Sequence, residues 1–281
     1  MTPDRNQAAR ELLAFYLEAG VDAVLGETAV DRFADTAVAA QPAIGQPQDE
    51  VARAGDPQPG NRPALDRSRP PPAAMAAPAP LSPDTAVMAA REEAKSARTL
   101  DELRSILDGF TGCTLRATAT RLVFADGNPQ ARVMFVGEAP GRDEDIEGLP
   151  FVGRSGKLLD RMMAAIGLTR ANAYIANIVP WRPPGNRTPT PQESATCLPF
   201  TLRQIELVDP DMLVCLGGPS AQTLLGSREG ILRTRGRWFP FQTGSREIRA
   251  TATLHPAYLL RQPLQKRLAW RDFLAIKKAL G

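Results

Sequence analysis

Residues 133–141 read VMFVGEAPG, and this stretch decides the fold. Its first four residues are all apolar, which is typical of a strand buried on both faces in a parallel sheet. The two glycines that flank Pro140 predict a tight loop after the strand, with backbone amides that can approach a ligand closely. Glu138 lies inside that loop, so a charged side chain follows directly on a core strand.

Strands and helices alternate on both sides of this stretch. Before it, helices are expected at 82–96 and at 99–108, the second opened by a capping box of Thr99 and Glu102. After it, the patterns predict strands at 174–179, 212–216 and 248–254, and helices at 156–166, 192–207 and 219–225. Such alternation predicts an α/β fold: a three-layer α/β/α sandwich with a central, mainly parallel four-stranded sheet. Sheets of this kind hold their sites at the carboxyl ends of the strands.

The chain divides into three zones. Residues 1–40 carry apolar positions near helical spacing, which predicts an N-terminal helical segment. Residues 41–83 are rich in Pro and Ala and cannot bury enough apolar surface to offset the entropy of ordering, so a disordered linker is expected. Residues 84–281 form the compact domain. The N-terminal segment either recruits a protein partner or is a poorly ordered appendage, and its sequence does not separate the two.

The composition of the 281 residues is ordinary for a globular protein, with 43% hydrophobic and 23% charged residues. No apolar run approaches the roughly 18 residues of a membrane span, and the N-terminus lacks the pattern of a signal peptide. A cytoplasmic monomer with no membrane contact is therefore expected. The net charge of +3 permits nucleic-acid binding without requiring it. His255 is the single histidine, which excludes a two-histidine zinc site within this chain.

Three polar side chains stand at or near the predicted carboxyl ends of three strands: Glu138, Asn177 and His255. Each alone has an ordinary alternative, namely a turn residue, an amide bonded to a neighbouring loop, and a structural histidine. Because the ends of parallel strands meet at one edge of a sheet, three such groups together favour an active site. The Asn177 amide offers a donor and an acceptor side by side, which suits the edge of a nucleobase.

Two segments are rich in arginine. Residues 181–187 read WRPPGNR and precede a helix that Thr190 and Glu193 open as a capping box. Residues 233–238 read RTRGRW. Arginines in such loops suit phosphate groups, although a solvated surface loop has the same composition. The two segments together favour DNA binding.

These motifs, in their order along the chain, resemble those of the family 4 uracil-DNA glycosylases over residues 103–281. They are GEAPG at 137–141, Glu144-Asp145, GLPFVG at 148–153, Asn177, RPPGNR at 182–187 and HPAYLLR at 255–261. A single string arises by chance, whereas this many in order are a strong signal. The resemblance implies a monofunctional glycosylase that acts on uracil-containing DNA. Such an enzyme hydrolyses the N-glycosidic bond of deoxyuridine, releases uracil and leaves an abasic site.

The resemblance also implies roles for individual residues. Glu138 would be the catalytic carboxylate, which positions water or stabilises positive charge on the sugar, and His255 would donate a hydrogen bond to uracil O2. Phe151 would stack on the flipped base, Asn177 would read its Watson–Crick edge, and Ala139 and Gly141 would offer backbone contacts. The residues expected to contact DNA are Arg182, Asn186, Arg187, Arg235, Tyr258, Leu259 and Arg261. Those at 258–261 would hold the gap left by the extruded base.

One departure from the family concerns the 4Fe-4S cluster that its members bind through four cysteines. Cys113 and Cys197 match the second and fourth ligand positions, whereas Phe110 and Trp181 stand at the first and third. Because four thiolates are the usual requirement, no cluster and no other metal are expected, and the aromatic side chains are expected to pack in its place. Cys215 lies in a predicted strand and is expected in the core.

Two other functions are consistent with parts of the sequence. A non-catalytic or product-holding protein that binds uracil or abasic sites would keep the basic loops, but Glu138 and His255 argue against it. A doubly wound nucleotide-binding enzyme needs a Gly-rich phosphate loop, and residues 137–141 have neither the dinucleotide fingerprint nor a P-loop lysine. Relatives that trap DNA covalently use a histidine in an extra loop after the second strand. No histidine or insertion stands there, so trapping is disfavoured.

Overall fold

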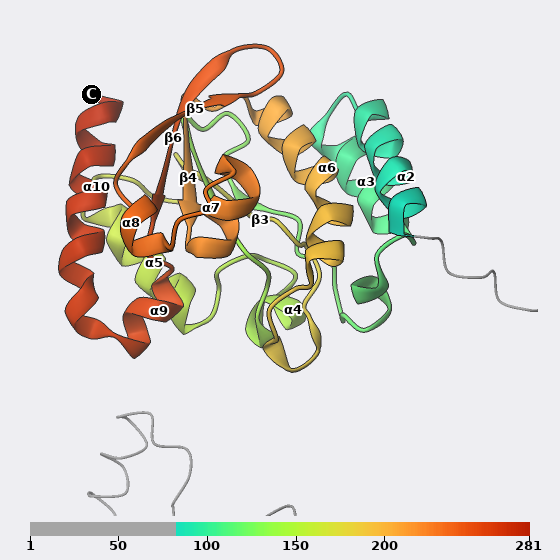
Figure 1. The fold of residues 1–281 in the computed structure, drawn as a ribbon, viewed down its shortest axis with the longest axis horizontal. Coiled ribbons are helices and arrows are strands. Elements are labelled where there is room, and N and C mark those ends of the chain that lie inside the picture. The colour runs from blue at the N-terminus through green and yellow to red at the C-terminus, as the bar shows by residue number, and fades with distance from the viewer. Residues whose placement is uncertain (1–82) are drawn as a thin grey trace, which may run out of the picture. The chain divides into compact units, whose positions relative to one another are not determined.

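The computed structural model describes residues 83–281, so the expectations for 1–40 and, apart from Pro83, for 41–83 lie outside the described residues. The described part has a sheet with helices on both sides (Figure 1). The helices are α2 (Pro83–Ser96), α3 (Leu100–Gly109), α4 (Arg142–Glu147), α5 (Arg154–Ala164), α6 (Pro191–Val208), α7 (Gly218–Leu225), α8 (Ile231–Thr234), α9 (Pro256–Arg261) and α10 (Lys266–Leu280). Short 3-10 turns are η1 (Thr114–Ala117), η2 (Pro184–Asn186) and η3 (Pro263–Gln265).

The sheet is mainly parallel. Its strands are β1 (Asp126–Gly127), β2 (Val133–Gly137), β3 (Tyr174–Asn177), β4 (Met212–Leu216), β5 (Trp238–Gln242) and β6 (Glu247–Thr253). They lie in the order β1-β3-β2-β4-β6-β5. The four inner strands are parallel to one another, and β1 and β5 pair antiparallel at the two edges. The predicted sandwich around a parallel four-stranded centre is confirmed, and the strand count of four is corrected to six.

The two edge strands are missing from the sequence prediction for a physical reason. β1 has only two residues, and both Asp126 and Gly127 belong to types that are depleted in strands. β5 contains Pro240, which has no N–H to donate to a ladder and is therefore restricted to an edge. The basic segment 233–238 supplies only the last two residues of α8, Arg233 and Thr234. Residues 235–237 form a turn, and Trp238 begins β5.

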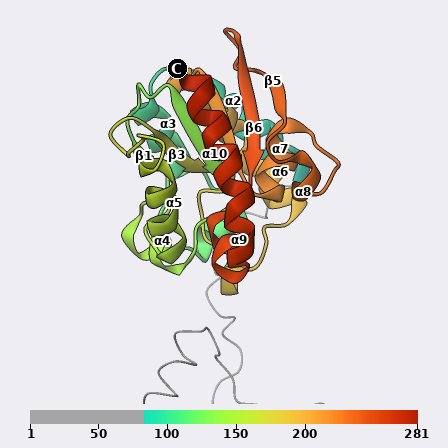
Figure 2. The same cartoon turned by 90° about the vertical axis from the view of Figure 1, so that its left-hand side faces the viewer.

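The uniformly apolar character of the inner strands follows from the two covered faces. Met134 and Val136 of β2 pack in one core cluster with residues of α2, α3, α6 and α7. Val133 and Phe135 point the other way and pack with residues of α5 and α10. Figure 2 shows α5 and α10 on the face turned toward the viewer. Since successive side chains of a strand alternate between faces, a sheet with both faces covered needs apolar residues at every position.

Local signals set several helix ends as expected. Thr190 Oγ1 accepts a hydrogen bond from the amide of Glu193, and the Glu193 carboxylate accepts one from the amide of Thr190, which completes the predicted capping box of α6. Thr99 caps α3 by accepting a hydrogen bond from the amide of Glu102, but the Glu102 carboxylate accepts from the amide of Arg98 instead of Thr99, so only half of the predicted capping box forms. Within residues 83–281, none of the helices has both the length and the apolar character needed to cross a membrane.

Candidate active site

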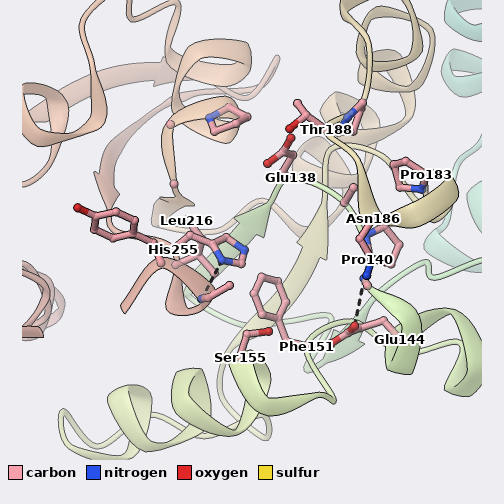
Figure 3. Close-up of a pocket in the computed structure, with 18 of the residues that line it drawn as sticks. Glu138, Pro140, Glu144, Phe151, Ser155, Pro183, Asn186, Thr188, Leu216 and His255 are labelled. Carbon is pink, nitrogen blue, oxygen red and sulfur yellow. Dashed lines mark hydrogen bonds between the residues drawn. The ribbon is translucent and has the colours of Figure 1, made fainter. Parts of the chain in front are cut away.

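A cavity of about 540 Å³ opens where β2, β4 and β6 end (Figure 3). This volume is in the usual range for a small-molecule site. The residues of the sequence prediction that line it are Glu138, Ala139, Gly141, Phe151, Asn186, Arg187, His255, Tyr258 and Arg261. The parallel sheet therefore brings together groups more than a hundred residues apart, at the edge where the topology predicts a site.

Glu138 follows β2 directly and is half-buried at the cavity. Its Oε1 atom is buried and has no hydrogen-bond partner. Removal from water disfavours the charged carboxylate, so burial raises the pKa of Glu138 above its ordinary value. A buried oxygen without a partner next to a cavity is free to accept a hydrogen bond from water or from a ligand.

Asn177 and Phe151 meet beside the end of β2. Asn177, the last residue of β3, pairs in register with Gly137, the last residue of β2. An ideal Cβ on Gly137 would lie 2.4 Å from Oδ1 of Asn177 and 2.6 Å from Cζ of Phe151, so a side chain there would displace both. Asn177 is buried, and its Oδ1 has no hydrogen-bond partner. The Phe151 ring lines the cavity, whereas Asn177 lies next to this ring and does not itself line the cavity.

His255 stands at the end of the β6 segment as the N-cap of α9. Its Nδ1 accepts a hydrogen bond from the amide of Ala257 at 3.1 Å. A ring nitrogen that accepts carries no proton, so the neutral imidazole carries its proton on Nε2. Burial, together with the positive charge of Arg261, lowers the pKa of His255 to about 4. The ring is therefore neutral at pH 7 and presents Nε2–H as a donor. Its centroid lies 5.5 Å from that of Phe151.

Glu144 joins the two glycine-containing motifs of the site. Its carboxylate accepts hydrogen bonds from the amides of Gly141 at 3.1 Å, Val152 at 3.1 Å and Gly153 at 3.0 Å. The loop after β2 is thereby fastened to the 148–153 segment. Figure 3 shows Glu144 and Pro140 on one side of the cavity and His255 on the other. Glu144 thus holds together two segments of the cavity wall.

The arginines of the 182–187 loop are largely used to brace it. Arg182 donates from Nε to Oδ1 of Asn186 at 2.7 Å. Arg187 makes two hydrogen bonds to the Glu193 carboxylate, at 2.8 and 2.7 Å. Asn186 and Arg187 line the cavity and Arg182 does not. Because the Arg187 side chain is still 43% exposed, it keeps a surface that a phosphate can approach.

Two residues expected to contact DNA are placed elsewhere. The Arg235 guanidinium pairs with the buried carboxylate of Asp272 and donates to the carbonyl of Leu268. Leu259 is only 1% exposed and packs in a core cluster with Ala269. The Arg235 side chain is only 13% exposed and Leu259 is in the core, so the structure does not place either side chain for the expected DNA contact. An ion pair holds the first, and the hydrophobic core holds the second.

Several residues that line the cavity are absent from the sequence prediction. Ser155 lies in the first turn of α5, and Thr188 follows the arginine-containing loop. Leu216 and Gly217 stand at the end of β4, which contributes no polar residue. Their positions in the sequence could have identified them, because each is adjacent to a motif or to the carboxyl end of an inner strand. Ser155 lines the same cavity as Phe151 (Figure 3).

The four positions that correspond to the family's cluster ligands hold two sulfur atoms and two aromatic rings. The Cys197 thiol donates to the sulfur of Cys113 at 3.7 Å. Phe110 and Trp181 are both buried, and Phe110 packs edge-to-face on Phe200 with 5.0 Å between ring centroids. Among residues 83–281, no three His, Cys, Asp or Glu side chains are grouped to hold a metal ion. The residues present do not fit a four-thiolate cluster.

Comparison with known proteins identifies one family. The model of the uracil DNA glycosylase superfamily matches residues 124–274. The type-4 uracil-DNA glycosylase of Archaeoglobus fulgidus is 38% identical over 187 residues, which are 65% of this chain and 94% of that protein. The protein of the same name from Thermotoga maritima is 43% identical over 152 residues, 54% of this chain and 78% of that protein. The protein of the same name from Saccharolobus solfataricus is 39% identical over 174 residues, which are 60% of this chain and 81% of that protein.

Proposed function

The chain belongs to the uracil DNA glycosylase superfamily and is a uracil-DNA glycosylase. We propose that Glu138, His255 and Asn177 are the residues that act on the uracil nucleotide. The observation that carries this proposal is a pair of atoms. Among the buried side-chain oxygens and nitrogens of residues 83–281, two lack a hydrogen-bond partner: Oε1 of Glu138 and Oδ1 of Asn177. Buried polar groups are nearly always hydrogen-bonded, so two orphans near one cavity indicate a ligand that completes them.

The proposed chemistry is hydrolysis of the bond between the base and C1′. As that bond breaks, its electron pair leaves with uracil, and the sugar becomes positively charged. The Glu138 carboxylate stabilises this charge, and it accepts a proton from the water whose hydroxyl adds to C1′. The Nε2–H of His255 donates to O2 of the departing uracil, where negative charge develops. A neutral donor is suited to this role because it needs no change of protonation as the base leaves.

Recognition of the base is proposed to involve Asn177 and Phe151. The Asn177 amide donates to uracil O4 and accepts from N3–H, whereas cytosine presents the opposite pattern. Phe151 stacks on the flipped ring, and the backbone around Ala139 and Gly141 contacts its edge. The orphan Oδ1 of Asn177 is the acceptor that N3–H requires. A non-catalytic binding protein is not favoured, because the similar proteins are named glycosylases.

Contacts with the rest of the DNA are proposed for side chains at the cavity rim. Tyr258, Arg261, Asn186 and Arg187 all line it, and the arginines suit phosphates. With Leu259 in the core, the wedge that fills the gap in the duplex needs another apolar side chain. Leu264 in η3 is 85% exposed. It follows Arg261 by three residues, so we assign it the role expected of Leu259.

Asn177→Ala is expected to reduce kcat/KM for uracil excision about 10- to 100-fold, the equivalent of the hydrogen bonds lost to the base. The free energy of unfolding is expected to stay unchanged or to rise, since the substitution removes a buried oxygen that has no partner in the free protein. Steady-state kinetics and urea denaturation measure the two effects. Full activity, or a large loss of stability without loss of activity, would assign Asn177 to the core.

We also propose that the enzyme works without a 4Fe-4S cluster. The purified full chain is expected to contain iron only at trace level by elemental analysis and to lack the visible absorption of a cluster. The control is a double variant, Phe110→Cys with Trp181→Cys, which supplies the two missing thiolates. When both proteins are incubated with iron and sulfide under the same conditions, this variant is expected to take up iron. Stoichiometric iron in the wild-type protein would contradict the proposal.

The remaining proposals concern the cellular setting. Uracil-containing DNA is the partner that the family implies. Action on cellular DNA agrees with the cytoplasmic location expected from the sequence. The recruitment of a protein partner by residues 1–40 and the monomeric state stay predictions.

A further inference from the structure

Phe151 adopts a backbone conformation that a side chain disfavours. Its φ is 55°, in the left-handed region, where a residue with a Cβ atom costs roughly 1–2 kcal/mol. Such conformations persist where the surrounding structure over-determines them, and they gather at functional sites. The Phe151 ring is buried between the end of β2 and the imidazole of His255. The backbone at this one residue therefore decides where the ring lies.

Arg170 holds this backbone from nineteen residues away. Its Nη1 donates to the carbonyl of Pro150 at 3.0 Å, and its Nη2 donates to the carbonyl of Phe151. The guanidinium is in turn fixed by two carboxylates, through Nη1 to Asp126 and through Nε to Asp160 at 2.9 Å. All three nitrogens of the Arg170 guanidinium therefore donate hydrogen bonds. Their partners are two backbone carbonyls and two carboxylates.

The segment is held from its other side as well. Glu144 binds the amides of Val152 and Gly153, the two residues after Phe151. The Phe151 carbonyl also packs tightly on the start of α5, since an ideal Cβ on Gly156 would lie 1.6 Å from that oxygen. The carbonyl is therefore confined between Gly156 and Arg170. Glu144 lines the cavity, whereas Gly156 and Arg170 are not among the residues that line it.

We propose that Arg170 is a positioning residue for excision: by holding the Pro150 and Phe151 carbonyls, it keeps the Phe151 ring where the uracil ring stacks. The inference rests on the proposed stacking role of Phe151. The planar fork of arginine is needed because a lysine ammonium cannot reach two carbonyls and two carboxylates together. Misplacement of the ring by a fraction of an ångström to an ångström is expected to reduce both uracil affinity and the rate of excision.

The test compares Arg170→Met and Arg170→Lys with wild type, using single-turnover excision and inhibition by free uracil. Arg170→Met is expected to lower excision about 10- to 100-fold and to weaken uracil inhibition, while Arg170→Lys loses less. Arg203→Met is the matched control. Arg203 is 27% exposed against 25% for Arg170, and it likewise joins a backbone carbonyl to a carboxylate. Unlike Arg170, it bonds no residue that lines the cavity, since its partners are Ala97 and Glu206, so its loss is expected to affect stability but not uracil inhibition.

A double-mutant cycle with Phe151→Ala separates positioning from a general structural role. If Arg170 acts through the ring, Arg170→Met adds little to the loss already caused by Phe151→Ala. Equal effects of Arg170→Met in both backgrounds, or unchanged excision and uracil inhibition in the single variants, would overturn the proposal. If Arg170→Met does not fold, Arg170→Lys carries the same cycle with the same criteria. A wild-type chain that does not excise uracil would instead contradict the proposed function.

Discussion

Glu138→Gln is expected to bind uracil-containing DNA and to excise uracil about 10²- to 10⁴-fold more slowly than the wild-type enzyme. The substitution keeps the size of the side chain but removes the negative charge. The amide can neither accept the proton of the attacking water nor stabilise the positive sugar. The measurement is single-turnover release of uracil from a labelled oligonucleotide with one uracil, followed by alkali to cleave the abasic sites. Binding is measured separately by titration with the same DNA.

The pH profile of the wild-type enzyme provides a second readout for the same residue. Burial raises the pKa of Glu138 above 4.5. The carboxylate therefore takes up a proton, and kcat/KM falls, as the pH drops through a value higher than that of an ordinary glutamate. This acid limb is expected to disappear in Glu138→Gln. Glu147→Gln is the control, because Glu147 is an exposed glutamate outside the cavity lining. A wild-type rate in Glu138→Gln would assign the carboxylate to the structure of the loop.

Loss of the His255 donor is expected to lower excision about 10²- to 10³-fold, the usual cost of removing one donor to a developing oxyanion. Two variants distinguish the role of Nδ1, which caps α9, from the role of Nε2, which donates to uracil. His255→Asn keeps an acceptor that can replace Nδ1 at the amide of Ala257, but it has no atom in the place of Nε2. His255→Gln places an amide donor near Nε2 and loses the cap. We expect His255→Gln to retain more activity, measured by single-turnover excision. The opposite order would indicate that His255 serves α9 rather than uracil.

Stability as a function of pH tests the protonation state on which this mechanism depends. The pKa of His255 is about 4 in the folded protein against 6.5 ordinarily. Between these values the unfolded chain binds more protons, so the free energy of unfolding falls as the pH drops from 6.5 toward 4. The His255 share of this fall is at most about 3 kcal/mol. Urea denaturation of His255→Asn is expected to show a smaller fall. Identical profiles would mean that the pKa of His255 is the same in the folded and the unfolded chain.

The sequence determined the framework because its signals are local. Continuous apolar runs at 133–136 and 212–216 indicate strands covered on both faces, and a capping box such as that of Thr190 and Glu193 is complete within four residues. Once the strands are parallel, their carboxyl ends share one edge, so Glu138, Asn177 and His255 were predictable as neighbours. The edge strands were not, because β1 is two residues long and β5 owes its place to pairing with β6.

Only the tertiary structure decided how the side chains are used. Leu259 and Arg261 belong to one motif, yet the first is in the core and the second lines the cavity. Arg235 is paired with Asp272, thirty-seven residues away, and Arg170 reaches back to the carbonyl of Phe151. These partners come together only when the sheet and its covering helices have assembled. Composition and spacing report which groups a chain carries, whereas burial and long-range contacts decide which of those groups stay free to meet a substrate.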